Sequence, residues 1–202
     1  MASFGVVIGT FGDKSWADRA EIAAHSAMEA GADMIVTEHG SSLAQARNAG
    51  AAKLDTDIVT FLDADDRLDK SFFDNLDNYV DLNEKILYKP QTLGMYPDGS
   101  FDESACFIQT KDFFRTNCLV IGTSMRLVDF MTDGQFDDTL PVLEDWDMFL
   151  RLYIAGSRIV ECEGVVYIVG VNEGRNSQVD LHRKTYRYVA TKYARYRNLV
   201  KR

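Results

Sequence analysis

The sequence predicts an α/β protein with a Rossmann-type mixed, mainly parallel sheet flanked by helices. In residues 1–90, short β-rich runs alternate with the apolar spacing of helices. Residues 58–62 are almost wholly apolar, as expected of a strand whose sheet is covered by helices on both faces. A chain of 202 residues suits one domain with a tail.

The first half is expected to alternate strictly between strands and helices. We predict strands over residues 5–8, 34–37 and 58–62, and helices over residues 15–30 and from 41 or 42 to 53. Ser15 can cap the first helix, Gly31 is placed to end it, and Ser41 or Ser42 can begin the second. Strands joined by helices in this order pair in parallel through right-handed crossovers.

The second half is less regular. We predict a strand over 85–89, a turn at 97–99, a helix over 144–155 that Gly156 closes, and late strands over 158–160 and 165–171. Residues 101–140 mix short strands and loops with little clear periodicity.

Composition limits the function. The net charge of −9 argues against a general nucleic-acid binder. The three cysteines, Cys106, Cys118 and Cys162, are widely spaced and are typical of reduced thiols in an intracellular protein. Residues 1–9 are typical of a first strand and not of a signal peptide, and no run is apolar enough to span a membrane. We therefore expect a soluble, cytoplasmic protein.

Residues 181–202 differ from the rest of the chain. They hold eight Lys or Arg, four Tyr and no acidic residue. The preceding 180 residues hold 14 basic and 31 acidic residues, a net charge of −17. In residues 181–202, the spacing of the tyrosines and valines predicts an amphipathic helical tail. Three partners remain open for it: the acidic body or a second subunit, an anionic membrane, or an anionic polymer such as nucleic acid.

An acidic cluster, Asp63-Ala64-Asp65-Asp66, follows the third predicted strand. Ligands of open α/β sheets bind at the carboxyl ends of strands. Asp63 and Asp65 alternate along an extended segment and could share a divalent ion, for which oxygen ligands favour Mg²⁺ or Mn²⁺. The alternative is a solvated loop in which Asp66 or Asp69 caps the next helix. Arg67 and Leu68 stand where an EF-hand needs an oxygen ligand and Gly, and Asp66 rules out a phosphatase-type nucleophile motif.

Several ordered motifs resemble the family 2 glycosyltransferases, which have the GT-A fold. They are Ala46-Arg47-Asn48-Ala49-Gly50 with the Asp-Ala-Asp-Asp cluster, Gly134-Gln135-Phe136-Asp137-Asp138, and Glu144-Asp145-Trp146-Asp147 followed by Arg151-Leu152. The resemblance covers most of the first 180 residues. It implies a GT-A-like domain over 1–180, with a nucleotide-sugar half over 1–90 and an acceptor half over 91–180.

The resemblance also implies catalytic roles. Asp65, with Asp63 nearby, would hold the metal that neutralises the leaving diphosphate. Asp145 would be the general base, and Glu144 would orient the acceptor or support the base. The alternative is that acidic residues in the first turn only interact with the helix dipole, and this is the interpretation that we favour for Asp147, as a cap or surface charge. Trp146 is expected to be a packing residue that could line the acceptor cleft.

The nucleotide contacts are expected from three places. Thr10 and Phe11 correspond to the family's base-contacting loop, and Glu38 is the nearest match to an acid that contacts the base. Arg47 could contact the base or the diphosphate, the alternative being a surface residue paired with Asp55 or Asp57.

One departure from the family concerns a His that many relatives carry after the last strand. This chain has residues 169–177 there instead, in which Asn172 or Glu173 could substitute as an oxygen ligand and Arg175 is expected to bind phosphate. The three histidines, His25, His39 and His182, are scattered and are expected to be structural.

The sequence thus predicts a metal-dependent, inverting glycosyltransferase that moves a sugar, UDP-linked by default, to a hydroxyl acceptor, which could be a glycan, a protein or lipid-linked. A sugar-nucleotide pyrophosphorylase is the alternative enzyme, although residues 9–14 are poor in Gly and Arg for its phosphate loop. A non-catalytic relative that binds sugar or a partner is the third possibility, and a homo-oligomer is left open.

Overall fold

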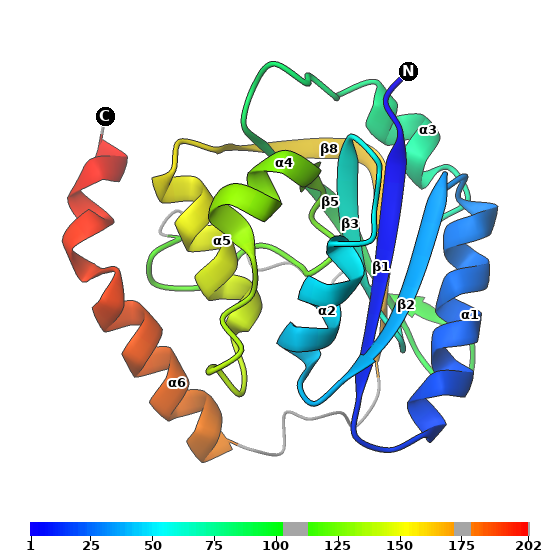
Figure 1. Cartoon of the computed structure of the whole chain (residues 1–202), viewed down its shortest axis with the longest axis horizontal. Helices are drawn as coiled ribbons and strands as arrows, with labels where there is room; N and C mark the ends of the chain where they lie inside the picture. Colours follow the sequence, from blue (N-terminus) through cyan, green and yellow to red (C-terminus); the bar gives the residue numbers. More distant parts are fainter. Residues whose placement is uncertain (103–112, 172–178, 202) are drawn as a thin grey trace.

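The structure is a computed structural model that describes residues 1–102, 113–171 and 179–201. Its first sheet has four strands in the order β2-β1-β3-β7 (Figure 1). They are β1 (Phe4–Phe11), β2 (Met34–Gly40), β3 (Ile58–Asp63) and β7 (Met125–Arg126). Both β2 and β3 pair in parallel with β1, as the sequence predicts, whereas β7 pairs with β3 in the antiparallel direction.

Two helices cover opposite faces of this sheet: α1 (Ser15–Glu29) and α2 (Leu43–Ala51) (Figure 1). Residues 58–62 of the strand between them are fully buried, which explains why that strand is apolar on both sides. The predicted cap of α2 is confirmed, since the Ser42 hydroxyl accepts a hydrogen bond from the Gln45 N–H. The cap predicted at Ser15 is wrong. Ser15 is the first helical residue, and its N–H donates to the Asp13 carboxylate at 2.7 Å.

The second sheet has the order β4-β8-β5-β6, formed by β4 (Arg67–Leu68), β8 (Arg158–Gly170), β5 (Ile86–Met95) and β6 (Phe101–Asp102). The long β5 and β8 strands pair in parallel. The predicted turn is confirmed: the Gly99 N–H donates to the Tyr96 carbonyl, and Gly99 has the positive φ of 83° that favours glycine.

The two late strands predicted from the sequence are a single strand. β8 runs from Arg158 to Gly170, with a register shift opposite Pro90 and Gln91. Gly164 lies in this bulge with φ of 79°. The glycine that resembles a strand break in the sequence therefore only bends the strand.

The remaining helices are α3 (Phe72–Asp77), α4 (Leu127–Asp129) with a π-helical turn at Phe130–Gly134, α5 (Glu144–Ile154) and α6 (Val179–Lys192), followed by a 3₁₀ segment at Ala194–Lys201. Gly156, with φ of 103°, follows α5 as predicted. One hydrophobic core joins both sheets with α1, α3 and α5. Within the described residues, none of the helices has the length and apolarity that crossing a membrane needs.

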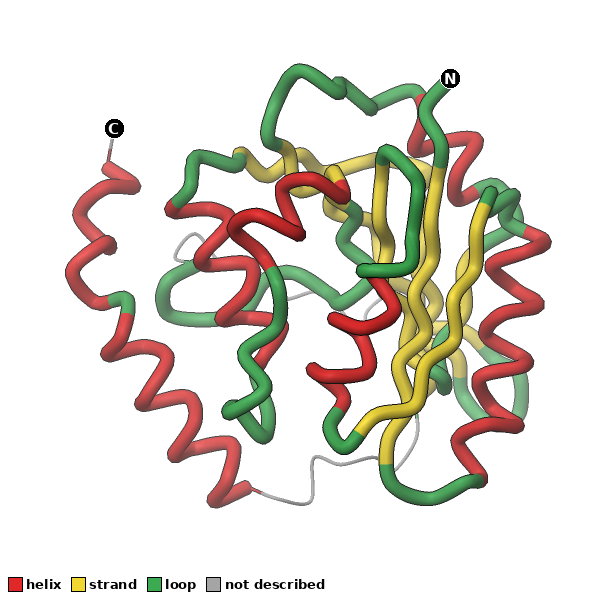
Figure 2. The backbone as a smooth tube through the Cα atoms, viewed as in Figure 1, coloured by secondary structure: helices red, strands yellow, loops and turns green. Residues whose placement is uncertain are grey.

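The tail packs along α5 (Figures 1 and 2). Tyr186 of α6 stacks on Trp146 with ring centroids 5.4 Å apart. The carboxylate of Asp147 is fully buried and accepts hydrogen bonds from Lys192 at 2.7 Å and Tyr193 at 2.8 Å. Asp147 is therefore not the cap or surface charge expected of it but the buried partner of the tail. The tail thus packs on the acidic body of its own chain, which is the first of the three partners considered for it.

Of the cysteines, Cys118 and Cys162 are free thiols, and burial raises the pKa of both. Cys106 lies outside the described residues.

Candidate active site

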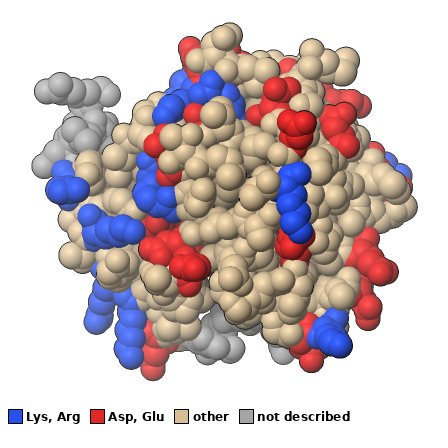
Figure 3. Space-filling model, in the orientation of Figure 1, with Lys and Arg blue, Asp and Glu red and all other residues tan. Residues whose placement is uncertain are grey.

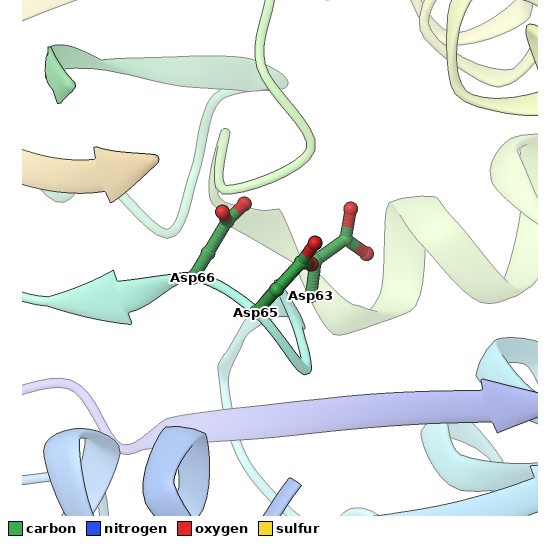
Figure 4. Close-up of side chains that lie close together, drawn as sticks. All are labelled: Asp63, Asp65 and Asp66. Atoms are coloured by element: carbon green, nitrogen blue, oxygen red, sulfur yellow. The ribbon is translucent and has the colours of Figure 1, made fainter. Parts of the chain in front are cut away.

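Three carboxylates cluster where β3 ends. Asp63 is the last residue of the strand, and a tight turn closes when the Asp66 N–H donates to the Asp63 carbonyl at 3.0 Å. One oxygen from each of Asp63, Asp65 and Asp66 lies within 4.8 Å of the others, and the side chains point to the same side of the loop (Figure 4). An all-oxygen group of this size fits a hard divalent cation such as Mg²⁺ or Mn²⁺.

Asp66 is the buried member of this cluster. Its two oxygens accept hydrogen bonds from the Tyr167 hydroxyl at 2.7 Å and from the Gly170 N–H at 2.8 Å. Burial, together with the nearby charge of Asp63, raises its pKa well above the ordinary value. Asp66 ties the loop to β8, which leaves Asp63 and Asp65 as the better candidates to hold an ion.

Arg47 connects the acidic loop to α5. Its side chain is 3% exposed and donates to Asp63 at 2.5 Å and to Glu144 at 2.8 Å. The expected alternative, a surface arginine paired with Asp55 or Asp57, is wrong, and Asp57 instead accepts hydrogen bonds from Ser3. A buried guanidinium between two carboxylates offsets part of the repulsion between the two acidic motifs.

Asn48, the residue after Arg47 in α2, holds the motif at residues 134–138 in place. The Asn48 side chain donates to the Phe136 carbonyl at 2.9 Å and accepts from its N–H at 2.8 Å. From the other side, Arg151 of α5 donates to the Asp133 carbonyl at 2.8 Å and also to the carbonyls of Gly134 and Gln135. The sequence motifs that lie far apart in the chain are thus hydrogen-bonded to one another.

Asp145 lies in the first turn of α5. It accepts hydrogen bonds from its neighbouring Trp146 N–H at 2.7 Å and from the Asn117 amide at 2.9 Å. Burial and the adjacent charge of Glu144 raise the pKa of Asp145 to about 7. A carboxylate with a pKa near neutrality is well suited to accept a proton from a hydroxyl.

The two motifs open onto one cavity of about 540 Å³. Asp63, Arg47, Glu144 and Asp145 line it, and Phe11 lies on its wall. Leu143, which precedes α5, also lines it in a left-handed conformation with φ of 61°, a strained geometry for a branched side chain. Asp65 lines a separate cavity of about 160 Å³, so the acidic loop lies between the two cavities.

The family's sequence model, described as glycosyl transferase family 2, matches residues 12–145. The chain belongs to this family. Comparison with curated protein sequences finds no match.

Solved structures of S. aureus TarS have the same fold as this family 2 chain. TarS 1–349 in complex with UDP has a TM-score of 0.64 at 14% identity, covering 84% of this chain and 61% of TarS 1–349. The complex with UDP-GlcNAc has a TM-score of 0.64 at 13% identity, covering 86% and 60%. Another TarS structure has a TM-score of 0.60 at 13% identity, covering 84% of this chain and 37% of that TarS chain. The expected GT-A-like α/β fold is confirmed, and the chain spans about 60% of TarS 1–349.

The residues expected to contact the nucleotide in this family 2 chain are not all in the same place. Phe11 and Arg47 line the larger cavity, and Glu38 and Thr10 are not among its lining residues. Glu38 pairs with Lys53. The Thr10 hydroxyl donates to the Glu38 carbonyl at 3.2 Å and lies 3.1 Å from His39 Nδ1.

Two residues of this site were not predicted. Asn117 bonds Asp145 but lies in a region without recognisable periodicity, so no sequence signal marks it. His182, expected to be structural, lines the larger cavity. Arg175, Asn172 and Glu173 lie outside the described residues.

Proposed function

We propose that the chain is a metal-dependent, inverting glycosyltransferase that transfers a sugar from a UDP-linked donor to a hydroxyl acceptor. Membership of family 2 supports sugar transfer, and TarS 1–349, which has the same fold, forms complexes with UDP and with UDP-GlcNAc. The single observation that carries the proposal is that Asp63 and Asp145 line the same cavity.

On the donor side, Asp63 and Asp65 would hold a Mn²⁺ or Mg²⁺ ion. When bound, such an ion neutralises the negative charge that a departing nucleoside diphosphate develops. Phe11 would stack on the nucleobase at the cavity wall. Arg47 would act mainly through the acidic groups that it joins, because Asp63 and Glu144 already occupy its guanidinium.

On the acceptor side, Asp145 would remove the proton of the attacking hydroxyl. The Asn117 amide fixes one carboxylate oxygen and the Trp146 N–H the other, which orients the group before the acceptor arrives. Glu144, held by Arg47, keeps a negative charge beside it that raises its basicity. A base on one side of the sugar and a leaving group on the other correspond to a single displacement, which inverts the anomeric centre.

The proposal is tested by screening nucleotide sugars for thermal stabilisation with and without Mn²⁺, followed by transfer assays with the donor that binds. We expect Mn²⁺-dependent stabilisation by a UDP-sugar, and loss of turnover in Asp145→Asn with the fold retained. Asp74→Asn, an exposed acid on α3, is the control and should keep full activity. Binding without turnover would favour a non-catalytic relative, and full activity of Asp145→Asn would exclude the proposed base.

A further inference from the structure

A second cavity, of about 460 Å³, lies beside the one that contains the carboxylates. Leu143 and His182 line both cavities, so the two share a wall. Asn117, whose amide bonds the Asp145 carboxylate, also lines the second cavity. A molecule seated there would lie next to the proposed base.

One wall of this second cavity is the stacked pair Trp146 and Tyr186, and a hydrogen bond to a backbone carbonyl holds each ring in place. The Trp146 ring N–H donates to the Phe113 carbonyl at 2.9 Å, and the Tyr186 hydroxyl donates to the Arg115 carbonyl at 2.6 Å. Trp146 is buried beneath Tyr186, which is itself 42% exposed. A rigid aromatic surface of this kind suits the apolar face of a sugar ring.

The cations at the cavity come from α6. Arg183 and Arg187 are four residues apart on this helix, both are exposed, and both line the cavity. Within the described part of the chain, neither is paired with a carboxylate, in contrast to Lys192, which is paired with Asp147. Figure 3 shows several Lys and Arg side chains at the side of the molecule where α6 lies, and others elsewhere on this face.

The charge of the rest of the chain limits what these cations can attract. Residues 1–180 carry a net charge of −17, which repels an extended polyanion or a flat anionic membrane. A short ligand with one negatively charged group avoids that repulsion. The guanidinium groups of two arginines favour phosphate or carboxylate oxygens as partners.

We propose that the cavity between α5 and α6 is the acceptor subsite, and that it takes a glycan bearing a phosphate or carboxylate group. The sugar ring lies over Tyr186, Arg183 and Arg187 hold the anionic group, and the hydroxyl to be glycosylated reaches Asp145 past Asn117. The role as acceptor rests on the proposed glycosyltransferase function, whereas the binding chemistry rests on the cavity alone.

The test measures binding through the fluorescence of Trp146. The chain has two tryptophans, so a Trp16→Phe background leaves Trp146 as the single reporter. With UDP and Mn²⁺ present to fill the donor site, the protein is titrated with glucose, glucose 6-phosphate, glucuronate and inorganic phosphate. We expect the two charged sugars to bind at least about tenfold more tightly than glucose.

The variants locate the effect. Arg183→Gln/Arg187→Gln should abolish the preference for charged sugars, whereas Lys184→Gln, an exposed cation of α6 that does not line the cavity, should retain it. Equal affinity for glucose and its phosphate, or an unchanged preference in the double variant, would overturn the proposal. Inorganic phosphate binding as tightly as the sugar phosphate would reduce the site to a simple anion site and overturn it too.

Two further measurements separate this proposal from its alternatives. Binding to phosphatidylglycerol vesicles that the double variant abolishes, with no binding of charged sugars, would replace the subsite with a membrane surface. If UDP neither binds nor supports sugar transfer, the proposed function fails. If UDP-sugar turnover occurs but charged sugars do not bind, only the acceptor class fails.

Discussion

Arg47 and Glu144 are 97 residues apart in the sequence, and the guanidinium of the first donates to the carboxylate of the second at 2.8 Å. The same guanidinium bonds Asp63, so one buried cation joins the strand that carries the acidic loop to the helix that carries Asp145. The relative position of the proposed metal site and the proposed base therefore depends on this side chain.

Replacing Arg47 with Met should destabilise the fold. Asp63 and Glu144 would lose their shared cation while remaining partly buried, which we expect to cost about 2–4 kcal/mol in the free energy of unfolding measured with urea. Lys53→Met is the control, because Lys53 is 56% exposed in its pair with Glu38 and should change stability by less than about 1 kcal/mol. Equal stability of Arg47→Met and wild type would contradict the bridging role.

The pH dependence of transfer should report Asp145. Its pKa is about 7, so kcat/KM should fall as the pH drops below that value and the carboxylate takes up a proton. The charge of Glu144 raises this pKa, so Glu144→Gln should lower it and move the acidic limb of the profile to lower pH. A limb that stays in place or moves to higher pH in Glu144→Gln would show that another group titrates.

Removing the Asp147 carboxylate should loosen the tail. Asp147→Ala leaves Lys192 and Arg151 without their buried partner, and we expect a loss of about 3 kcal/mol in unfolding free energy and faster trypsin cleavage within α6. Asp74→Ala, at an exposed position of α3, should change stability by no more than about 0.5 kcal/mol. Unchanged cleavage of α6 in Asp147→Ala would mean that other contacts hold the tail.

A substitution at Gly122 tests the support of the acidic loop. A Cβ at this position would lie 1.9 Å from the Tyr167 ring, whose hydroxyl bonds Asp66. We expect Gly122→Ala to cost about 1–3 kcal/mol. Tyr167→Leu removes the ring, so the two changes together should cost less than their sum, and strict additivity in urea unfolding would contradict the packing described.

The parts of the fold that depend on local sequence could be predicted. The Ser42 cap, the glycine after α5 and the buried strand before Asp63 each follow from residues close together in the chain. The family motifs predict that Asp65 and Asp145 face one cleft. In the structure Asp63 and Asp145 line one cavity, whereas Asp65, two residues further along the acidic loop, lines a separate one.

The missed features depend on distant residues. An acid in the first turn of a helix is typically exposed, and Asp147 is buried only because Lys192 and Tyr193 arrive from the tail. Asn117 has no motif of its own, and Gly164 resembles a break because a bulge and a turn favour the same residue. The pairing of Glu38 with Lys53 likewise depends on how α2 packs beside β2.

The central claim is that one acidic motif holds the metal and diphosphate and the other removes the acceptor proton. Its most direct test is calorimetric titration of UDP with Mn²⁺ into wild type, Asp65→Asn and Asp145→Asn, with transfer measured on the same samples. We predict that Asp65→Asn loses Mn²⁺-dependent UDP binding, while Asp145→Asn binds UDP like wild type and transfers no sugar. Equal UDP binding by wild type and Asp65→Asn, or transfer by Asp145→Asn, would contradict this division of roles.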